Sequence, residues 1–423
     1  MFIVEADYGV KVHIIGNINP LNNGWRLLFI SVTRFLSAKF PNIEFTKESL
    51  LPQIDEKLNP TCRCVKSMKS SVTLLVSTLI RALFWRLLKP LKINAAALFN
   101  EPLRYYYEAD VIIDLSGDGL CPPQSKGFWY SVAKVLFKLA NLASILIAIV
   151  LGKRVIIYSA SIGNLGILIP LASLILNNVD LIAVRDHESM EYLRRIKVTK
   201  PVIYFAPDAA FSLQIPNKNK ALKNGHMPVI GFNLSTEAVQ HFHRVDLQHF
   251  ARLIGSIISD ISESLNATVM LIPFSLGGPF KHDDDRIILN EVLKHTAGGN
   301  ISIMMDKDPF STVNAISRCN ILVTMRMHPA IISLLCGVPP LVVSHSPKFQ
   351  GLIKLIGIRD LLCTLPQSDL ASLKEKILHV WRNKDVLCAQ IEKRAGDLVA
   401  ASLNGLERMA LMLREIAGCR QHP

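Results

Sequence analysis

Short β-branched runs alternate with longer amphipathic stretches along most of the chain, a pattern typical of parallel β-α-β units. In the first half, the predicted strands are residues 10–15, 110–115, 154–158, 181–185 and 202–204, with a helix over 25–39. In the second half, they are 229–234, 268–273, 301–305, 321–324 and 340–343, with helices over 247–265, 309–318 and 329–336. Residues 369–416 have a helical pattern, and the polar, turn-rich stretch 217–228 is the best linker candidate.

These two series predict an α/β protein with two Rossmann-like, doubly wound domains that face a cleft. We place the domains at residues 1–220 and 226–365, followed by C-terminal helices at 366–423. In such sheets, ligands bind beyond the carboxyl ends of the strands. The loops that follow the strands are therefore where chemistry is expected.

Composition narrows the class of protein. Half of the 423 residues are hydrophobic and 19% are charged, which excludes a disordered chain. Eight cysteines are too few for a disulfide scaffold, and Met1 is not followed by a signal-peptide pattern, so we expect reduced thiols and a cytoplasmic protein. The best uncharged window, residues 139–152, is shorter than the ~20 residues of a membrane-spanning helix and predicts a buried crossover helix instead.

The net charge of +13 is concentrated in one segment, residues 57–93, which we interpret as a basic amphipathic insert. Its eight cations are Lys57, Arg63, Lys66, Lys69, Arg81, Arg86, Lys89 and Lys92. No acid occurs from Lys57 to Asn100, and Phe84 and Trp85 lie among leucines. Such a helix can lie peripherally on an anionic membrane, or it can pack on its own domain, and both readings stay open. Nucleic acid is not expected, because the aromatic residues are not spaced as a stacking platform.

The most informative chemistry follows the predicted strand 321–324. Arg326 and His328 stand between this strand and a helix that Pro329 would begin, a position that collects anions. Arginine offers a fork of donors for a carboxylate or phosphate, and histidine can transfer a proton near neutral pH. Lys348 follows the next strand. The alternative is a helix-capping pair without chemistry.

The spacing of Arg326, His328 and Gly337-x-Pro339, followed by a strand and Lys348, resembles the polysaccharide pyruvyl transferase family. Further pieces fall in the family's order at residues 22–24, 110–118, 159–166, 184–189, 207–211 and 230–234. Trp25, Asp118 and residues 345–346 depart from the family's common pattern, which bears on acceptor specificity more than on the fold.

The resemblance implies a GT-B-like fold and transfer of a pyruvyl group from phosphoenolpyruvate onto two hydroxyls of a sugar, forming a ketal. The acceptor would belong to a surface polysaccharide or its lipid-linked precursor, and no cofactor is implied. Carried onto this sequence, the resemblance gives the following roles: Arg185, Arg326 and Lys348 for the donor's anionic groups, His328 as the acid, Asp118 or Asp208 as the base, and Asn23, Gly24 and Gly163 as further substrate-binding positions.

Several of these residues also have purely structural interpretations. Asp186 and Asp208 can cap a helix or turn, Asn23 and Gly24 can form a plain turn, and Gly163 can serve packing alone. No metal is expected. Residues 282–285 read as the start of a helix, and Cys62 and Cys64 lack partner ligands nearby.

Two other functions compete with pyruvyl transfer. One is a GT-B glycosyltransferase that uses a nucleotide sugar, for which no clear acid follows a strand in the second half to hold a ribose. The other is a catalytically inactive, membrane-associated binding protein, which the Arg326 and His328 pair argues against.

Overall fold

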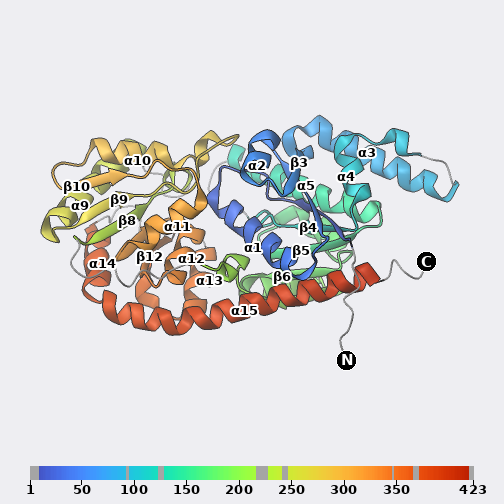
Figure 1. Ribbon diagram of the computed structural model, residues 1–423. Helices are drawn as coiled ribbons and strands as arrows, with labels where there is room; N and C mark the ends of the chain where they lie inside the picture. The colour runs from blue at the N-terminus through green and yellow to red at the C-terminus, as the bar shows by residue number, and fades with distance from the viewer. Residues whose placement is uncertain are drawn as a thin grey trace, which may run out of the picture.

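Two β-sheets, one from each half of the chain, organise the protein, and their paired strands run parallel (Figure 1). The computed structural model describes residues 9–91, 95–121, 128–215, 227–240, 246–344, 347–364 and 371–418. The seven-stranded sheet has the order β3-β2-β1-β4-β5-β6-β7, and the six-stranded sheet has the order β10-β9-β8-β11-β12-β13. In each sheet, the first three strands are added outward in one direction and the later strands in the other, so the strand order switches between β1 and β4 and between β8 and β11. This order confirms the doubly wound prediction.

The strands of the first sheet are β1 (Lys11–Ile15), β2 (Glu44–Ser49), β3 (Cys62–Lys66), β4 (Val111–Asp114), β5 (Arg154–Ala160), β6 (Leu181–Val184) and β7 (Val202–Phe205). Those of the second are β8 (Val229–Asn233), β9 (Thr268–Leu271), β10 (Asn300–Ile303), β11 (Ile321–Thr324), β12 (Pro340–Ser344) and β13 (Leu362–Thr364). The predicted linker at 217–228 falls mainly outside the described residues.

The helices are α1 (Asn23–Lys39), α2 (Pro52–Leu58), α3 (Val72–Leu88), α4 (Glu101–Glu108), α5 (Phe128–Val150), α6 (Ile169–Leu176), α7 (His187–Arg195), α8 (Thr236–Ala238), α9 (Leu247–Ser264), α10 (Asp285–Lys294), α11 (Pro309–Ser317), α12 (Met327–Leu335), α13 (Pro347–Ile356), α14 (Ala371–Arg382) and α15 (Lys384–Gly418). Strands β4, β6 and β11 are buried along their whole length. Helices cover both faces of parallel sheets, which is why these strands read as continuous apolar runs.

The sequence analysis missed β2, β3 and β13. The sequence does not predict β2 because this strand contains charged residues, which the fold buries. Lys47 Nζ lies 2.9 Å from Asp55 Oδ2, and Glu48 accepts hydrogen bonds from Ser67 and Tyr106. The basic insert predicted at 57–93 is therefore wrong at its start, because residues 62–66 form the edge strand β3 and Lys69 donates to the buried amide of Asn141.

Among the helices that the structure describes, α5 contains a stretch that is long and apolar enough to cross a bilayer, Val132–Val150. It connects β4 to β5, and its second half is part of the domain core, with Leu142, Ile145 and Ala148 fully buried. This packing agrees with the crossover helix that the sequence predicts.

The 35-residue helix α15 holds the two halves of the molecule together and runs along both of them (Figure 1). Leu387 and Ile391 belong to the core of the second sheet, whereas Leu406 and Met409 belong to the core of the first. Between these segments, Gly405 lies so close to β7 that an added Cβ would be 2.4 Å from Ala206 Cβ. The Gly405 carbonyl also accepts a 2.8 Å hydrogen bond from the Tyr204 hydroxyl.

Replacing Gly405 by alanine should lower the free energy of unfolding by about 1–3 kcal/mol, because overpacking outweighs the gain in helix propensity. Gly396 provides the matched control, since an added Cβ there would meet nothing within 4 Å. Gly396→Ala should stabilise the protein by about 0.5–1 kcal/mol. Urea denaturation followed by circular dichroism measures both changes, and equal effects of the two substitutions would contradict the close packing of α15 on β7.

Candidate functional site

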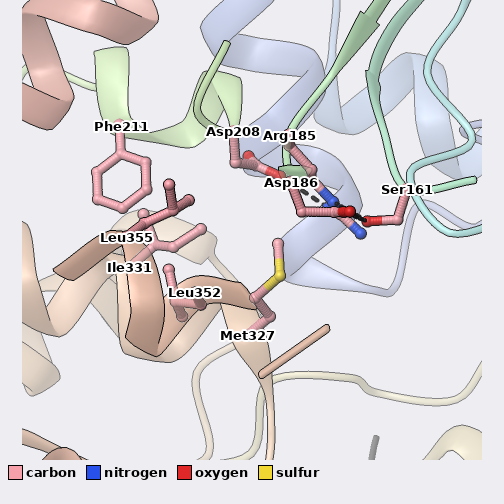
Figure 2. A pocket seen from close by; sticks show the side chains of 9 residues that line it. All are labelled: Ser161, Arg185, Asp186, Asp208, Phe211, Met327, Ile331, Leu352 and Leu355. Carbon is pink, nitrogen blue, oxygen red and sulfur yellow. Dashed lines mark hydrogen bonds and ion pairs between the residues drawn. The ribbon is translucent and has the colours of Figure 1, made fainter. Parts of the chain in front are cut away.

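A small pocket lies between the two halves of the molecule, at the carboxyl ends of strands from both sheets (Figure 2). Its lining residues are Ser161, Arg185, Asp186, Asp208, Phe211, Met327, Ile331, Leu352 and Leu355. The polar residues all come from the first half of the chain, and α12 and α13 contribute apolar side chains. The pocket thus has one charged wall and one apolar wall, a combination that is common in small-molecule sites.

The charged wall is built on the ion pair between Arg185, just after β6, and Asp208, just after β7. Arg185 Nη1 donates to Asp208 Oδ2 at 2.7 Å, and Arg185 Nε donates to Ser161 Oγ at 3.0 Å. The two charged side chains are only 6% and 3% exposed. Burial alone would raise the pKa of Asp208, but the charges of His328 and Arg185 and the hydrogen bonds from Ala210 N–H and Arg185 outweigh it and lower this pKa.

Both aspartates beside Arg185 also fulfil the structural roles that the sequence left open. Asp186 is the N-cap of α7, accepting from Ser189 N–H at 2.7 Å, and it accepts from Ser161 Oγ at 2.6 Å. Asp208 caps the short 3₁₀ helix Ala209–Ser212 by accepting from Ala210 N–H at 2.9 Å. Capping and site geometry are therefore not alternatives here, because each carboxylate does both.

His328 reaches this ion pair from the other half of the chain. It lies in the first turn of α12, and its Nε2 is 3.8 Å from Asp208 Oδ1. On its other side, a Cβ at Gly24 would be 2.5 Å from His328 Nδ1. The Asn-Gly pair at 23–24 therefore brings backbone against the imidazole, and any larger residue at position 24 would displace it.

Arg326 is not among the residues that line the pocket. Its guanidinium forms a bidentate ion pair with Asp285, in which Nε lies 2.9 Å from Oδ2 and Nη2 lies 2.6 Å from Oδ1. Nη2 also lies 2.6 Å from Asp283 Oδ1. Although burial opposes its charge, these two carboxylates raise the pKa of Arg326. Arg326 stands at the N-cap position of α12 without a side-chain cap bond, so it is not a simple helix cap.

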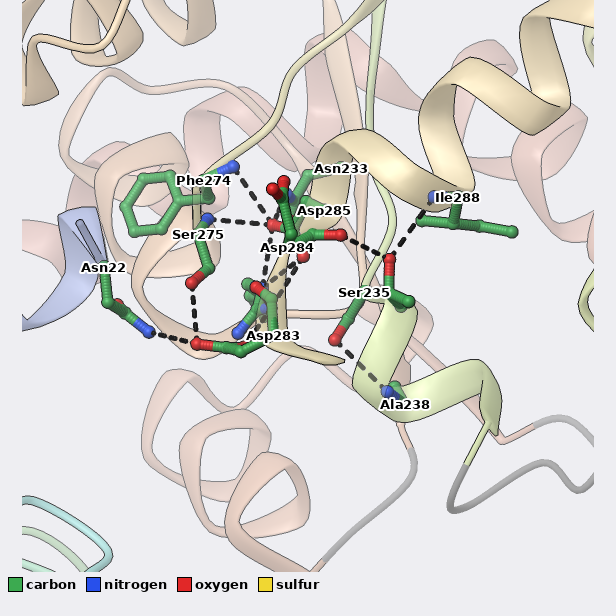
Figure 3. Close-up of polar contacts among 12 residues, drawn as sticks. Asn22, Asn233, Ser235, Ala238, Phe274, Ser275, Asp283, Asp284, Asp285 and Ile288 are labelled. Atoms are coloured by element: carbon green, nitrogen blue, oxygen red, sulfur yellow. Dashed lines mark hydrogen bonds and ion pairs between the residues drawn. The ribbon is translucent and has the colours of Figure 1, made fainter. Parts of the chain in front are cut away.

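The carboxylates that hold Arg326 are themselves anchored, as Figure 3 shows. Asp285 accepts from the backbone N–H groups of Phe274 and Ser275, both at 3.0 Å. Asp283 accepts from Ser275 Oγ at 2.6 Å and from Asn22 Nδ2 at 3.2 Å, and Asn22 belongs to the first half of the chain. Residues 282–285 lead into α10, as predicted, with Asp284 as its N-cap and Asp285 as its first residue.

A profile of the polysaccharide pyruvyl transferases matches residues 26–347, about three quarters of the chain. This chain belongs to the polysaccharide pyruvyl transferase family. No curated protein matches the sequence.

Solved structures similar to this transferase share its fold at low sequence identity. A glycosyltransferase from Rickettsia africae has 12% identity and a TM-score of 0.55, covering 97% of this chain and 99% of its own. Sucrose-phosphate synthase from Thermosynechococcus elongatus has 13% identity and a TM-score of 0.56, covering 97% and 100%. UDP-GlcNAc 2-epimerase from Neisseria meningitidis has 10% identity and a TM-score of 0.56, covering 96% and 100%. The GT-B-like fold is thereby confirmed.

In this family member, the predicted site residues Gly163 and Asp118 lie in two loops that contact each other. Ser161 N–H donates to the Gly117 carbonyl at 2.8 Å, and Gly163 N–H donates to the Leu120 carbonyl at 3.2 Å, so two loops lie side by side. Both terminal nitrogens of Arg185 lie within 4 Å of the Cβ position of Gly117, the residue before Asp118. Asp118 also adds to the negative field at Arg185.

Asn23 and Lys348 are the two predicted substrate-binding residues that remain. Asn23 is buried between the halves, and its Nδ2 donates to Thr312 Oγ1 at 3.3 Å, so it joins the domains rather than lining the pocket. Lys348 is the second residue of α13, and its side chain lies outside what the structure describes. Within the described ranges, no group of three or more His, Cys, Asp or Glu side chains is arranged to hold a metal ion.

Sequence reasoning also passed over useful residues. Ser161 and Met327 line the pocket, and Asp283 and Asp285 hold Arg326. Glu237, in α8 just after β8, is an acid that follows a strand in the second half of the chain. The strand-end position alone could have drawn attention to Ser161 and Glu237, whereas the partners of Arg326 required the fold.

Asp208→Asn should lower the free energy of unfolding at neutral pH by about 3–5 kcal/mol, because Arg185 would lose its buried partner. Since folding lowers the pKa of Asp208, its contribution is present above the ordinary value of 3.8 and is lost as the pH falls through the folded value. The gap between wild type and variant should therefore be constant near neutrality and shrink in acid.

The control is Asp180→Asn, which removes the negative charge from the 2.5 Å contact with Arg154, whose side chain is 59% exposed, and leaves an amide oxygen to accept from Val155 N–H. It should cost only about 0–1 kcal/mol. Chemical denaturation across a pH series measures both variants. A gap for Asp208→Asn that widens in acid would be inconsistent with the lowered pKa.

Proposed function

We propose that this family member transfers a pyruvyl group from phosphoenolpyruvate to two hydroxyls of a saccharide, releasing phosphate and leaving a cyclic ketal. The observation that carries the proposal is the position of His328, which the second half of the chain holds 3.8 Å from the buried Arg185–Asp208 pair of the first half. A proton donor and a paired cation thus meet between two domains, next to a pocket. Membership of the family supports a transferase that acts on polysaccharide.

In the proposed reaction, His328 gives a proton to carbon 3 of the enol while the first sugar hydroxyl bonds to carbon 2. The carbon–carbon double bond becomes a methyl group attached to a phosphorylated hemiketal carbon. The second hydroxyl then bonds to that carbon as the carbon–oxygen bond to phosphate breaks. One hydroxyl proton goes to a carboxylate base and returns from there through solvent to His328, and the other goes to the departing phosphate, so that phosphoenolpyruvate plus a diol gives ketal plus inorganic phosphate.

The electrostatics divide the two candidate carboxylates between different tasks. Asp208 is held ionised by Arg185, and its lowered pKa makes it a weak base but a good partner for a protonated His328. Its oxygen Oδ1 lies 3.8 Å from His328 Nε2, which exceeds hydrogen-bond length. Asp118, which is only partly buried and lies in the loop beside Arg185, is the better candidate to accept a hydroxyl proton.

The donor's anionic groups would be held near Arg185 and the N-terminus of α12. This helix begins at the pocket, which its first residue Met327 helps to line, and the dipole at a helix N-terminus favours negative charge. Because Arg326 is paired with Asp283 and Asp285, we assign it the task of fixing the β11–α12 turn that carries His328. Lys348 follows β12 and remains a candidate donor ligand by its position in the sequence. No cofactor is needed for this chemistry.

Replacing His328 by glutamine should leave phosphoenolpyruvate binding largely intact and slow turnover by ~10²–10⁴-fold, the usual contribution of a general acid. The acceptor is glycan prepared from a strain that lacks the gene. Phosphate release gives the rate, and mass spectrometry detects the pyruvyl ketal on the glycan. Near-normal turnover of the variant would exclude His328 as the proton donor. Turnover of a nucleotide sugar without consumption of phosphoenolpyruvate would instead establish a glycosyltransferase.

Asp118→Asn should leave the fold and donor binding intact but lower turnover by ~10²–10⁴-fold if Asp118 is the base. The wild-type rate should fall in acid as the base becomes protonated, and this limb of the pH–rate profile should vanish in the variant. An unchanged acid limb would assign the base role to another group. Calorimetric titration with phosphoenolpyruvate checks that the variant still binds the donor.

A further inference from the structure

Helix α3 packs on the first domain through one narrow face. Thr78, Ala82 and Trp85, spaced by four and three residues, are its buried side chains. The Trp85 ring lies 5.6 Å from the ring of Tyr107 and 6.5 Å from that of Phe99. The sequence left open whether the helix that carries Trp85 meets a membrane or its own domain; Trp85 itself is 8% exposed and anchors α3 to its own domain.

The opposite side of α3 is apolar and faces solvent. We call it the apolar face of α3, and it comprises Val72, Val76, Ile80, Leu83, Phe84, Leu87 and, in the following turn, Leu91, each between 45% and 75% exposed. At ~100° per residue these positions fall on one stripe, about 25 Å long. The solvent side of a surface helix is normally polar, so a continuous apolar stripe marks an interaction surface.

Cations gather at the C-terminal end of α3, on the side of Trp85 rather than along the centre of this stripe. Lys89 Nζ lies 5.1 Å from the centre of the Trp85 ring, and Lys153 Nζ lies 5.0 Å from the centre of the Tyr107 ring. A Cβ at Gly152, next to Lys153, would be 4.0 Å from Arg86 Nη1. We call Arg86, Lys89 and Lys153 the basic cluster. Since no acid occurs from Lys57 to Asn100, α3 itself provides no carboxylate to neutralise it.

We propose that the apolar face of α3 and the basic cluster together dock the protein on an anionic lipid bilayer, with α3 lying parallel to the surface. An anionic bilayer matches both features, because apolar side chains enter the boundary between headgroups and acyl chains while cations meet the lipid phosphates. A second copy of the chain matches only one of them, because it offers a second apolar face but, with no acid from Lys57 to Asn100, no carboxylate of its own α3 for the basic cluster.

The position of α3 in the fold suits this contact. It lies at the end of the molecule away from the second sheet (Figure 1). The inference does not depend on which reaction the pocket catalyses, and it extends the proposed function by placing the enzyme where lipid-linked saccharides are found.

The test is co-sedimentation of the full chain with vesicles of phosphatidylcholine, with and without about one third phosphatidylglycerol. Wild type should bind the anionic vesicles and lose most of that binding as salt rises from about 0.1 M to about 0.5 M. Leu83→Ser, Phe84→Ser and Leu87→Ser together should reduce partitioning at least about tenfold. Arg86→Gln with Lys89→Gln should weaken binding to anionic vesicles and flatten its salt dependence.

Two controls separate the proposal from its alternatives. Val386→Ser, Leu403→Ser and Leu411→Ser remove comparably exposed apolar side chains from α15 and should bind like wild type. Leu83→Ile, Phe84→Leu and Leu87→Ile keep the face apolar and should also bind. Circular dichroism and phosphate release with a soluble acceptor should be unchanged in all variants, so failure of the vesicle test is distinct from failure of the catalytic proposal.

The proposal is overturned if wild type does not bind anionic vesicles, or if the α15 variant loses as much binding as the α3 variant. It is also overturned if light scattering shows a wild-type dimer that the α3 serine variant disperses while neither protein binds vesicles. In that case the apolar face would be an interface between copies of the chain.

Discussion

The buried ion pair of Arg185 and Asp208 is the interaction on which the candidate site depends. Neither charge could be kept so far from water alone, and together they remain there because Ser161, Ala210 and the ends of two neighbouring strands supply the remaining hydrogen bonds. The pair gives the pocket a fixed charge pattern before any ligand arrives. It also places a carboxylate 3.8 Å from His328 Nε2.

Placing His328 beside this pair is a task shared by both halves of the chain. The ion pairs of Arg326 with Asp283 and Asp285 fix the turn from β11 into α12. Asp283 also accepts a hydrogen bond from Asn22 of the first half. Asn22 caps α1, and the following Gly24 leaves room for the imidazole. Helix α15 adds a longer connection, because Ser402 donates to the Asp208 carbonyl at 3.1 Å. The site is therefore a property of the domain arrangement.

The amino-acid composition of α3 does not determine which of its faces is exposed. Its cations and its leucines are visible in the sequence, and both a membrane helix and a packed surface helix have that composition. The structure combines the two readings. One narrow face is packed through Trp85, and the broad apolar face is exposed. Which face a helix buries depends on the domain it meets, and no helical periodicity can specify that when both faces are apolar.

The sequence by itself determined the alternation of strands and helices, the doubly wound order of two sheets, and the motifs that identify the family. These depend on local patterns, such as the buried run Ile321–Thr324 and the spacing of Arg326 and His328. It did not reveal β2, because strand propensity is judged from composition and Lys47 and Glu48 are charged. Only the tertiary structure decided that Arg326 is paired with Asp283 and Asp285, that Asn23 lies between the domains, and that His328 meets Asp208. The physical reason is that the free energy of a buried charge depends on partners that lie far away in the sequence and near only in the fold.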